Sequence, residues 1–333
     1  MGATIRDVAK LAQVSPATVS RYFSGSAVVG AELSKRIEDA AEQLEYVPVR
    51  TAIKHNQDTI IVLLPQTVQG YFSEVIKEIF RQLPKYKCKI LILPIIPGDD
   101  SYKSYFNDLY IRGVIYLDED IDPDTLRYIR AKNVRVVMLG GAAYDSRCDS
   151  VHVNDMAAAY EGMRYLLSLD HRDFLILADC SRAISSGAQR LLGCQQALKA
   201  YNVPYNEEQI VEYTELTYDS AYQAMQRALK QGKKFSAVFA FSDECAVSAI
   251  SALAEHGLRV PEDVSVLGFD GIPISRWTVP QLTTIYQPID KMVEWTLNTL
   301  CTMDGKKQTE NMDYTLPYKL LKRGTCKRRE ETT

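Results

Sequence analysis

Several features that mark other classes of protein are missing from this 333-residue chain. Its longest strongly apolar stretches, Thr59–Pro65 and Lys89–Pro97, have the length of buried strands and fall short of the ~18 residues that a membrane span needs. The N-terminal segment MGATIRDVAK has no apolar stretch of the kind that a secretory signal carries. We therefore expect a cytoplasmic protein with no membrane partner.

Paired cysteines and catalytic motifs are also missing. The seven cysteines are an odd number and form no Cys-x-x-Cys pair, which argues for reduced thiols and against a disulfide framework or a cysteine zinc site. His171 has no second metal ligand near it, and we expect it to be a loop histidine that bonds to backbone. No glycine-rich phosphate motif, Ser-His-Asp set or carboxylate pair stands out. The sequence predicts a protein that is not an enzyme and has no catalytic residues, cofactor or metal.

Net charge does not identify a partner either. The whole chain carries a formal charge of −3, and between residues 1 and 54 seven basic residues nearly balance six acidic ones. Nucleic-acid binding therefore has to be argued from the geometry of the helices and not from charge.

The first 48 residues read as three short helices. Thr4 and Asp7 have the spacing of a capping box, and Ser15-Pro16 is typical of an N-cap followed by the first residue of a helix. We expect helices that begin near Ile5, cover Ala17–Phe23 and cover Ala31–Leu44. The Gln13-Val14 link allows only a tight corner, so residues 1–48 predict a helix-turn-helix DNA-binding domain. The alternative is a small helical cap packed on the body.

Residues 49–58 are polar, lack a period and read as a hinge or linker. From Thr59 onward, short β-branched runs alternate with amphipathic helices, which predicts βαβ units and a parallel sheet. The expected strands are 59–64, 89–93, 113–117, 134–139, 174–177, 237–241 and 264–268, with helices such as 156–169, 188–201, 220–231 and 245–256 between them. This stretch is long for one sheet, so we expect residues 59–333 to form an effector-binding and dimerisation domain of two subdomains. These cover roughly 59–157 plus 288–312, and 158–287 plus 313–326.

The run from Thr4 to Arg21, together with Tyr46-Val47-Pro48, closely resembles the DNA-binding head of the lac/galactose repressor family. The resemblance implies that the second helix enters the major groove of DNA. It implies that Pro16, Ala17 and Arg21 face bases, while Thr4, Ser15, Thr18 and Ser20 meet phosphates. Because proline and alanine offer only apolar contact, hydrogen-bonded readout of the bases would rest largely on Arg21.

The body resembles the same family in the segments 186–193, 260–270 and 282–288, and in Ser242-Asp243 after the strand 237–241. This implies two Rossmann-like subdomains, as in periplasmic sugar-binding proteins, with Arg190 and Asp243 binding an effector at the mouths of strands. Tyr71 and Phe72 are expected in the loop after the first strand, over the ligand; the alternative for Phe72 is a place in the core. Asp270 is typical of the family and either binds the effector or caps a turn.

Two departures from the family pattern affect these expectations. Many sugar-binding members carry an acidic residue after the strand 134–139, where this chain has Gly140, so one hydroxyl contact is missing or supplied elsewhere. The linker looks short, and Ile53 is its only large aliphatic candidate for a wedge into the minor groove. Because isoleucine is β-branched, we expect it to bend DNA less than the leucine of the family.

Taken together, these residues predict a ligand-responsive transcription regulator, most simply a repressor. It would bind a near-palindromic operator as a homodimer, with a sugar or sugar derivative as effector. One alternative is a purine-type regulator in which the ligand strengthens DNA binding. The other is a solute-binding receptor, which should carry a signal peptide and no helix-turn-helix.

Overall fold

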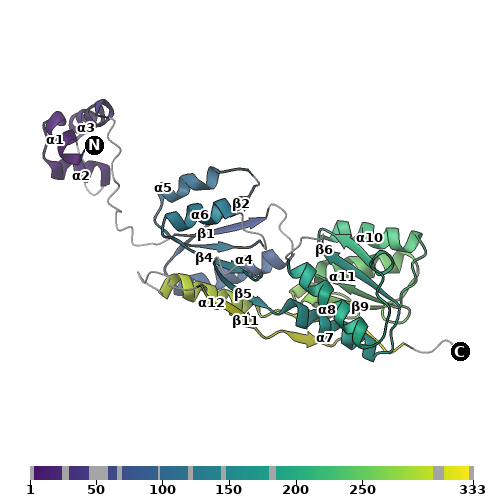
Figure 1. Cartoon of the computed structure of the whole chain (residues 1–333). Coiled ribbons are helices and arrows are strands. Elements are labelled where there is room, and N and C mark those ends of the chain that lie inside the picture. The colour runs from purple at the N-terminus through teal and green to yellow at the C-terminus, as the bar shows by residue number, and fades with distance from the viewer. Residues whose placement is uncertain are drawn as a thin grey trace. The chain divides into compact units, whose positions relative to one another are not determined.

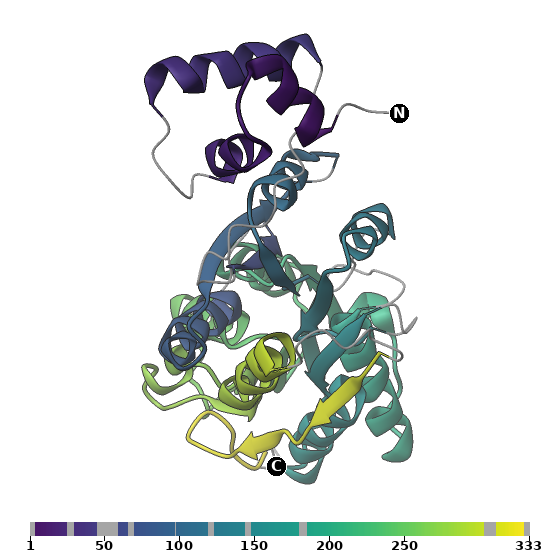
Figure 2. The same cartoon turned by 90° about the vertical axis from the view of Figure 1, so that its left-hand side faces the viewer.

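The computed structural model describes residues 4–24, 30–44, 59–65, 70–96, 98–118, 123–143, 148–179, 185–302 and 311–329. The chain divides into two compact units, Met1–Asp58 and Thr59–Thr333, which we call the head and the body (Figures 1 and 2). Within the described residues, no helix has both the length and the apolar character needed to cross a membrane.

The head consists of the three predicted helices, α1 (Ile5–Ala12), α2 (Pro16–Ser24) and α3 (Ala31–Gln43). The predicted capping box at Thr4 and Asp7 is present, and Gln13 ends α1 with a left-handed φ of 53° that turns the chain toward α2. Buried alanine, valine and isoleucine side chains from all three helices form one small core: Val8, Ala9, Ala12, Val19, Ile37, Ala40 and Ala41.

Within its described part, the body contains two sheets of six strands each. The first sheet contains β1 (Thr59–Pro65), β2 (Lys89–Ile95), β3 (Ile111–Tyr116), β4 (Arg135–Leu139), β5 (Asp149–Val153) and β11 (Asp313–Leu316). The second sheet contains β6 (Phe174–Asp179), β7 (Val211–Thr214), β8 (Ala237–Ala240), β9 (Ser265–Asp270), β10 (Thr283–Tyr286) and β12 (Lys319–Leu321).

The strand orders are those of two doubly wound sheets. The first sheet runs β11-β5-β4-β3-β1-β2, and all its neighbouring pairs are parallel. The second runs β12-β10-β9-β8-β6-β7 and is parallel except for β12 at its edge. Parallel sheets need both faces covered, which explains why β1 is buried along almost its whole length.

Helices cover both faces of each sheet (Figure 1). Packed on the first sheet are α4 (Gly70–Gln82) and α12 (Ile289–Thr302) on one face and α6 (Pro123–Ala131) on the other, with the short α5 (Tyr105–Asp108) nearby. Packed on the second sheet are α7 (Asp155–Ser168) and α8 (Ser186–Ala200) on one face and α10 (Tyr218–Lys230) and α11 (Asp243–Glu255) on the other, with the short α9 (Glu207–Ile210) before β7.

This architecture confirms the predicted fold class and changes one predicted boundary. Strand β11 lies at the edge of the first sheet, beside β5, although the sequence assigned residues 313–326 to the second subdomain. The chain returns to the second sheet only at β12. The sequence did not show this because Asp313 and Tyr314 at the start of β11 are exposed and give no apolar strand pattern.

His171 is buried before β6, where its ring bonds to two serine hydroxyls as well as to the backbone. Its Nδ1 lies 2.9 Å from Ser236 Oγ, and its Nε2 lies 3.0 Å from Ser265 Oγ and 3.1 Å from the carbonyl oxygen of Lys327. The sequence predicted the backbone contact but not the two hydroxyls. Burial lowers the pKa of His171, because the charged imidazolium would lose its hydration.

We expect this lowered pKa to give His171 a destabilising contribution in acid. Above the ordinary histidine pKa of 6.5 both states are neutral, whereas below it the unfolded chain binds a proton that the folded protein excludes. The free energy of unfolding should therefore fall with decreasing pH by up to about 1.4 kcal/mol per pH unit from this residue. Urea denaturation between neutral and mildly acidic pH measures the slope. Relative to the wild type, His171→Gln should lose this one contribution, so its free energy of unfolding should decline less, or rise more, as the pH falls. Equal slopes in the two proteins would show that His171 does not contribute.

Candidate functional site

The helix α2 presents the residues that the sequence placed against DNA bases. Pro16, Ala17 and Arg21 are exposed, whereas Thr18 and Ser20 are half-buried. Ser15 caps the helix, since its Oγ accepts a hydrogen bond from the backbone N of Thr18 over 3.0 Å. The backbone N–H groups at the start of α2 therefore lie beside the predicted base-facing side chains.

Hydrogen bonds within the head already use some of the hydroxyls predicted to meet phosphates. Thr4 Oγ1 donates to Asp7 Oδ2 over 2.6 Å, so the capping box and a phosphate compete for the same proton. Ser15 Oγ and Thr18 Oγ1 lie 2.8 Å apart. Only one of these two hydroxyls donates its proton in that contact. The hydroxyl that accepts keeps its own proton and can donate it to a phosphate. Ile53, the predicted hinge wedge, lies outside the described residues.

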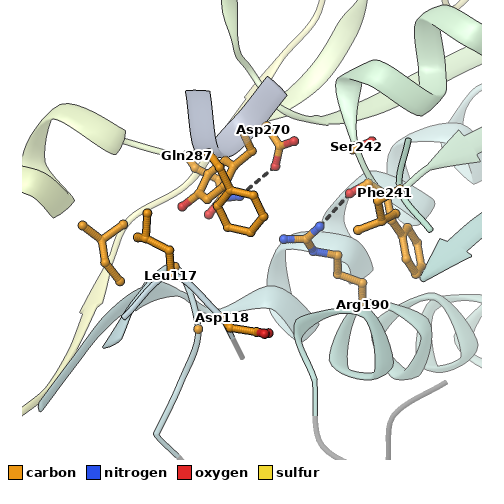
Figure 3. A pocket seen from close by; sticks show the side chains of 13 residues that line it. Leu117, Asp118, Arg190, Phe241, Ser242, Asp270 and Gln287 are labelled. Atoms are coloured by element: carbon orange, nitrogen blue, oxygen red, sulfur yellow. Dashed lines mark hydrogen bonds between the residues drawn. The ribbon is translucent and has the colours of Figure 1, made fainter. Parts of the chain in front are cut away.

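The body holds a small, partly open cavity of about 70 Å³ between its two sheets, at the carboxyl ends of parallel strands, and Figure 3 shows side chains that line it. This is where ligands of open α/β sheets bind. Four of the five residues predicted to bind the effector line it, and Asp243 does not. The full lining is Tyr71, Phe72, Leu117, Asp118, Leu139, Gly140, Gly141, Arg190, Leu216, Phe241, Ser242, Asp270 and Gln287.

Tyr71 and Phe72 reach the cavity from a helix. They lie in the first turn of α4, so the prediction that they belong to a loop is wrong. Their rings meet edge to face, with centroids 5.7 Å apart. Helical geometry places both aromatic side chains more rigidly than a loop would.

Arg190 extends from α8 toward Asp270 and Gln287 (Figure 3). It is 6% exposed. Its Nε donates to Asp155 Oδ1 over 2.8 Å and its Nη1 donates to the carbonyl oxygen of Phe241 over 2.6 Å. The guanidinium carbon also lies 3.8 Å from the centroid of the Phe269 ring. An ion pair, a carbonyl and an aromatic face thus fix the guanidinium before any ligand arrives.

Asp270 and Gln287 form a buried polar pair on the opposite side of the cavity. Gln287 Nε2 donates to Asp270 Oδ1 over 2.9 Å, and the backbone N of Gln287 donates to the carbonyl oxygen of Asp270 over 3.0 Å. Asp270 adopts a φ of 108°, which is strained for a residue other than glycine. Burial raises the pKa of Asp270 to about 7, although the Arg190 charge and the Gln287 amide act to lower it.

One acceptor in this pair has no partner. Gln287 is 2% exposed, and among the described residues no donor lies within hydrogen-bond distance of its Oε1. A buried carbonyl oxygen left without a donor costs about 1–3 kcal/mol. The cavity therefore offers an acceptor that a bound ligand with a hydroxyl or amine donor would satisfy.

Asp243 lies behind the cavity wall and is fully buried. Its Oδ2 accepts from the backbone N of Ile272 over 2.8 Å, and its Oδ1 accepts from the hydroxyl of Thr284. Burial, and then the charge of Asp270, raise the pKa of Asp243 well above its usual range. Its neighbour Ser242, which caps α11, lines the cavity instead. Because Asp243 is fully buried and does not line the cavity, direct contact with a ligand would require the side chain or the cavity wall to move.

Asp118 and Gln287 were not singled out as site residues in the sequence. Asp118 follows β3 and brings a carboxylate to the cavity from the first sheet, whereas Gly140 after β4 has none. A side chain at Gly140 would have its Cβ 2.9 Å from Tyr71 Oη, and the φ of 101° there also favours glycine. The tyrosine thus occupies the space that an acidic side chain at position 140 would need.

Glu244 joins the two halves of the body beside the cavity. Its Oε2 accepts from the backbone N of Gly70 at the start of α4, over 2.9 Å, and its Oε1 accepts from the backbone N of Tyr218 at the start of α10, over 3.3 Å. A carboxylate between two helix N-termini is well placed electrostatically. It holds α4 of the first subdomain against the second.

A helix-turn-helix head followed by a two-sheet body with a cavity at the carboxyl ends of its strands defines a class of ligand-responsive transcription regulators. Residues 4–49 match the family described as bacterial regulatory proteins, lacI family, and residues 163–326 match a periplasmic binding protein-like domain. The probable HTH-type transcriptional repressor ExuR of Bacillus subtilis (strain 168) is 30% identical over 318 residues, which cover 92% of this chain and 93% of that protein. The chain belongs to the lacI family of bacterial regulatory proteins.

Other similar proteins agree with this placement. The HTH-type transcriptional repressor PurR of Klebsiella pneumoniae (strain 342) is 32% identical over 330 residues, with 96% of each chain covered. A transcriptional regulator CelR–cellobiose complex matches the fold with a TM-score of 0.72 at 24% identity, over 97% of this chain and 99% of that one. A lac repressor dimer bound to operator and the anti-inducer ONPF matches with a TM-score of 0.69 at 24% identity, over 98% and 99%. These relatives are transcription regulators and not enzymes.

Proposed function

We propose that this protein is a cytoplasmic transcription repressor that binds a near-palindromic operator as a homodimer and responds to a sugar or sugar derivative. The observation that carries the effector site is the unpartnered Oε1 of Gln287, in the wall of the cavity that the fixed guanidinium of Arg190 also lines. The DNA-binding half is carried by the exposed face of α2 in a head of the lacI family.

The chemistry of the cavity favours a ligand with several hydroxyl groups. Gln287 Oε1 and the Asp118 carboxylate accept hydrogen bonds, whereas the Arg190 guanidinium donates them. Tyr71 and Phe72 supply an apolar surface against which a sugar ring can stack. Asp243 acts in this proposal as a positioning residue, because it holds the backbone of Ile272 and the hydroxyl of Thr284 next to the cavity.

A dimer is proposed because one helix-turn-helix reads only half of a two-fold symmetric site. The similar lac repressor structure is a dimer on its operator, which supports the same assembly here. Ligand binding between the two subdomains would shift the balance between their arrangements and so change operator affinity. We propose that Pro16, Ala17 and Arg21 face bases and that the hinge residue Ile53 enters the minor groove. The proposed phosphate contacts are Thr4, Ser15, Thr18 and Ser20.

A thermal-shift screen of the full chain tests the effector proposal. A ligand that binds only the folded protein raises its unfolding midpoint. We expect neutral sugars to raise it, and we expect Asp118→Asn to reduce that shift. A shift caused only by purines would replace the sugar proposal with the purine-type regulator, and a shift that persists unchanged in Asp118→Asn would remove Asp118 from the site.

Arg21→Ala should weaken operator binding by about 1–3 kcal/mol, the usual worth of a bidentate base contact. The operator is first selected from random duplex DNA with the wild-type chain, and affinities are then compared at one salt concentration. The loss of discrimination between bases should be confined to one base position in each half-site. Lys35→Ala, which removes an exposed cation from α3, should leave discrimination at that position intact. Equal affinity of Arg21→Ala and wild type would show that α2 is not the recognition helix.

A further inference from the structure

Two cysteines that are 213 residues apart in the sequence meet at one end of the first sheet. The Sγ atoms of Cys88 and Cys301 are 3.5 Å apart. Cys88 directly precedes β2, and Cys301 lies in the last turn of α12. Both side chains are partly exposed, whereas Cys194 and Cys245 are buried and burial raises the pKa of both thiols. An oxidant in solution can therefore reach the pair more readily than these two buried thiols.

Contacts on both sides hold the backbones that carry these thiols. The guanidinium of Arg112 on β3 donates to the last backbone carbonyls of α12, including that of Cys301. Tyr86 Oη donates to Asn298 Oδ1 on α12 over 2.8 Å, and Cys88 Sγ donates to the carbonyl oxygen of Tyr86 over 3.3 Å. The approach of the two sulfurs is thus part of a packed joint between α12 and the residues before β2.

We propose that Cys88 and Cys301 form a reversible disulfide when the protein meets an oxidised low-molecular-weight thiol such as oxidised glutathione. One cysteine thiolate attacks the S–S bond of the oxidant, forms a mixed disulfide and releases one reduced thiol. The other cysteine thiolate then attacks the protein sulfur of that mixed disulfide and releases the second thiol. The two protein thiols lose two protons and two electrons, which the oxidant gains. Side-chain rotation brings the sulfurs from 3.5 Å to the bonded distance of about 2.0 Å.

The disulfide would connect α12, which begins close to the cavity, to the segment that leads into β2. Lys89, the first residue of β2, pairs with Thr59, the residue with which β1 begins. At its other end, α12 begins at Ile289, two residues after the cavity residue Gln287. Oxidation would therefore join the helix that leaves the cavity to the end of the sheet where the first strand of the body begins. In a reducing compartment both thiols stay reduced, and the disulfide forms only when an oxidised low-molecular-weight thiol accumulates.

The test uses the full chain, reduced and then incubated with oxidised glutathione. Remaining thiols are blocked with iodoacetamide, and peptides are mapped by mass spectrometry without reduction. We expect the wild type to yield a Cys88–Cys301 linked peptide that dithiothreitol removes. Cys88→Ser and Cys301→Ser should each yield only a glutathione adduct on the remaining cysteine. Cys148→Ser, which removes a buried cysteine elsewhere, should form the link as the wild type does.

Thermal unfolding provides the second measurement. A disulfide that closes so long a loop restricts the unfolded chain, so the oxidised wild type should unfold several degrees above the reduced protein. Neither single variant should show this rise. The proposal is overturned if Cys88 and Cys301 both remain alkylated after oxidation, or if they link only to other cysteines or between chains. A link that lowers the midpoint would confirm that the disulfide forms and would overturn only the expected stabilisation, because the joint would then have to distort to accept the bond.

Discussion

Arg190→Ala is expected to lower the free energy of unfolding of the body by about 3–5 kcal/mol, because the buried Asp155 carboxylate would lose its cation. A loss of ligand binding in that variant would therefore combine the missing guanidinium contact with the lower stability of the body. Arg190→Lys separates them. Lysine keeps a positive charge beside Asp155 but lacks the planar fork that also reaches the carbonyl of Phe241. We expect the lysine variant to fold and to bind the effector about 10–100-fold more weakly.

Calorimetry with the ligand found by thermal shift measures the affinity, and urea denaturation measures the stability. Arg227→Lys is the matched control, because Arg227 pairs with Glu212 at a half-exposed site away from the cavity. It should change neither quantity measurably. Operator binding without ligand should survive in Arg190→Lys. Unchanged effector affinity in Arg190→Lys would show that the guanidinium has only a structural role and that the ligand lies elsewhere.

The head could be predicted from the sequence because its determinants are local. The Thr4–Asp7 capping box, the Ser15 cap and the tight corner at Gln13 each act over a few residues, and all appear in the structure. Only the competition between capping and phosphate contact was missed. That competition depends on where one proton of Thr4 goes, which residue types alone do not specify.

Strand β5 could not be predicted, because three of its five buried residues are polar. Asp149, Ser150 and His152 interrupt the apolar pattern that marks a strand buried on both faces. Their partners come from distant segments: Arg135 pairs with Asp149, and Asp313 accepts from both Ser150 and His152. The burial of such residues is decided by tertiary pairing, so no local pattern reveals it.

The candidate site could be predicted in outline but not in its contacts. Arg190 and Asp270 were recognised from family segments, and both line the cavity. Gln287 reaches Asp270 because β10 pairs with β9 in a register that aligns Tyr286 with Asp270. That register, and the inward turn of Asp243 toward Ile272, arise from sheet packing. Neither is contained in the spacing of residues along the chain.

Gly193 sets the geometry of Arg190 through the packing of two helices. A Cβ added at Gly193 on α8 would lie 2.2 Å from the backbone oxygen of Met156 on α7 and 2.9 Å from the backbone N of Tyr160. The backbones of the two helices are therefore in direct contact at this point. Met156 follows Asp155, and Gly193 lies one turn after Arg190, so the same close approach brings the ion pair to 2.8 Å.

Gly193→Ala should therefore destabilise the body and weaken the site together. The methyl group meets backbone atoms that cannot rotate away, so we expect a loss of about 3 kcal/mol, even though alanine gains about 1 kcal/mol over glycine within a helix. Separation of α7 from α8 should also lengthen the Arg190–Asp155 contact and lower effector affinity. Urea denaturation and calorimetry measure the two effects. Gly30→Ala places the same methyl group in open space and should leave the body unchanged. If Gly193→Ala lost stability but kept full effector affinity, the position of Arg190 would not depend on the contact between these helices.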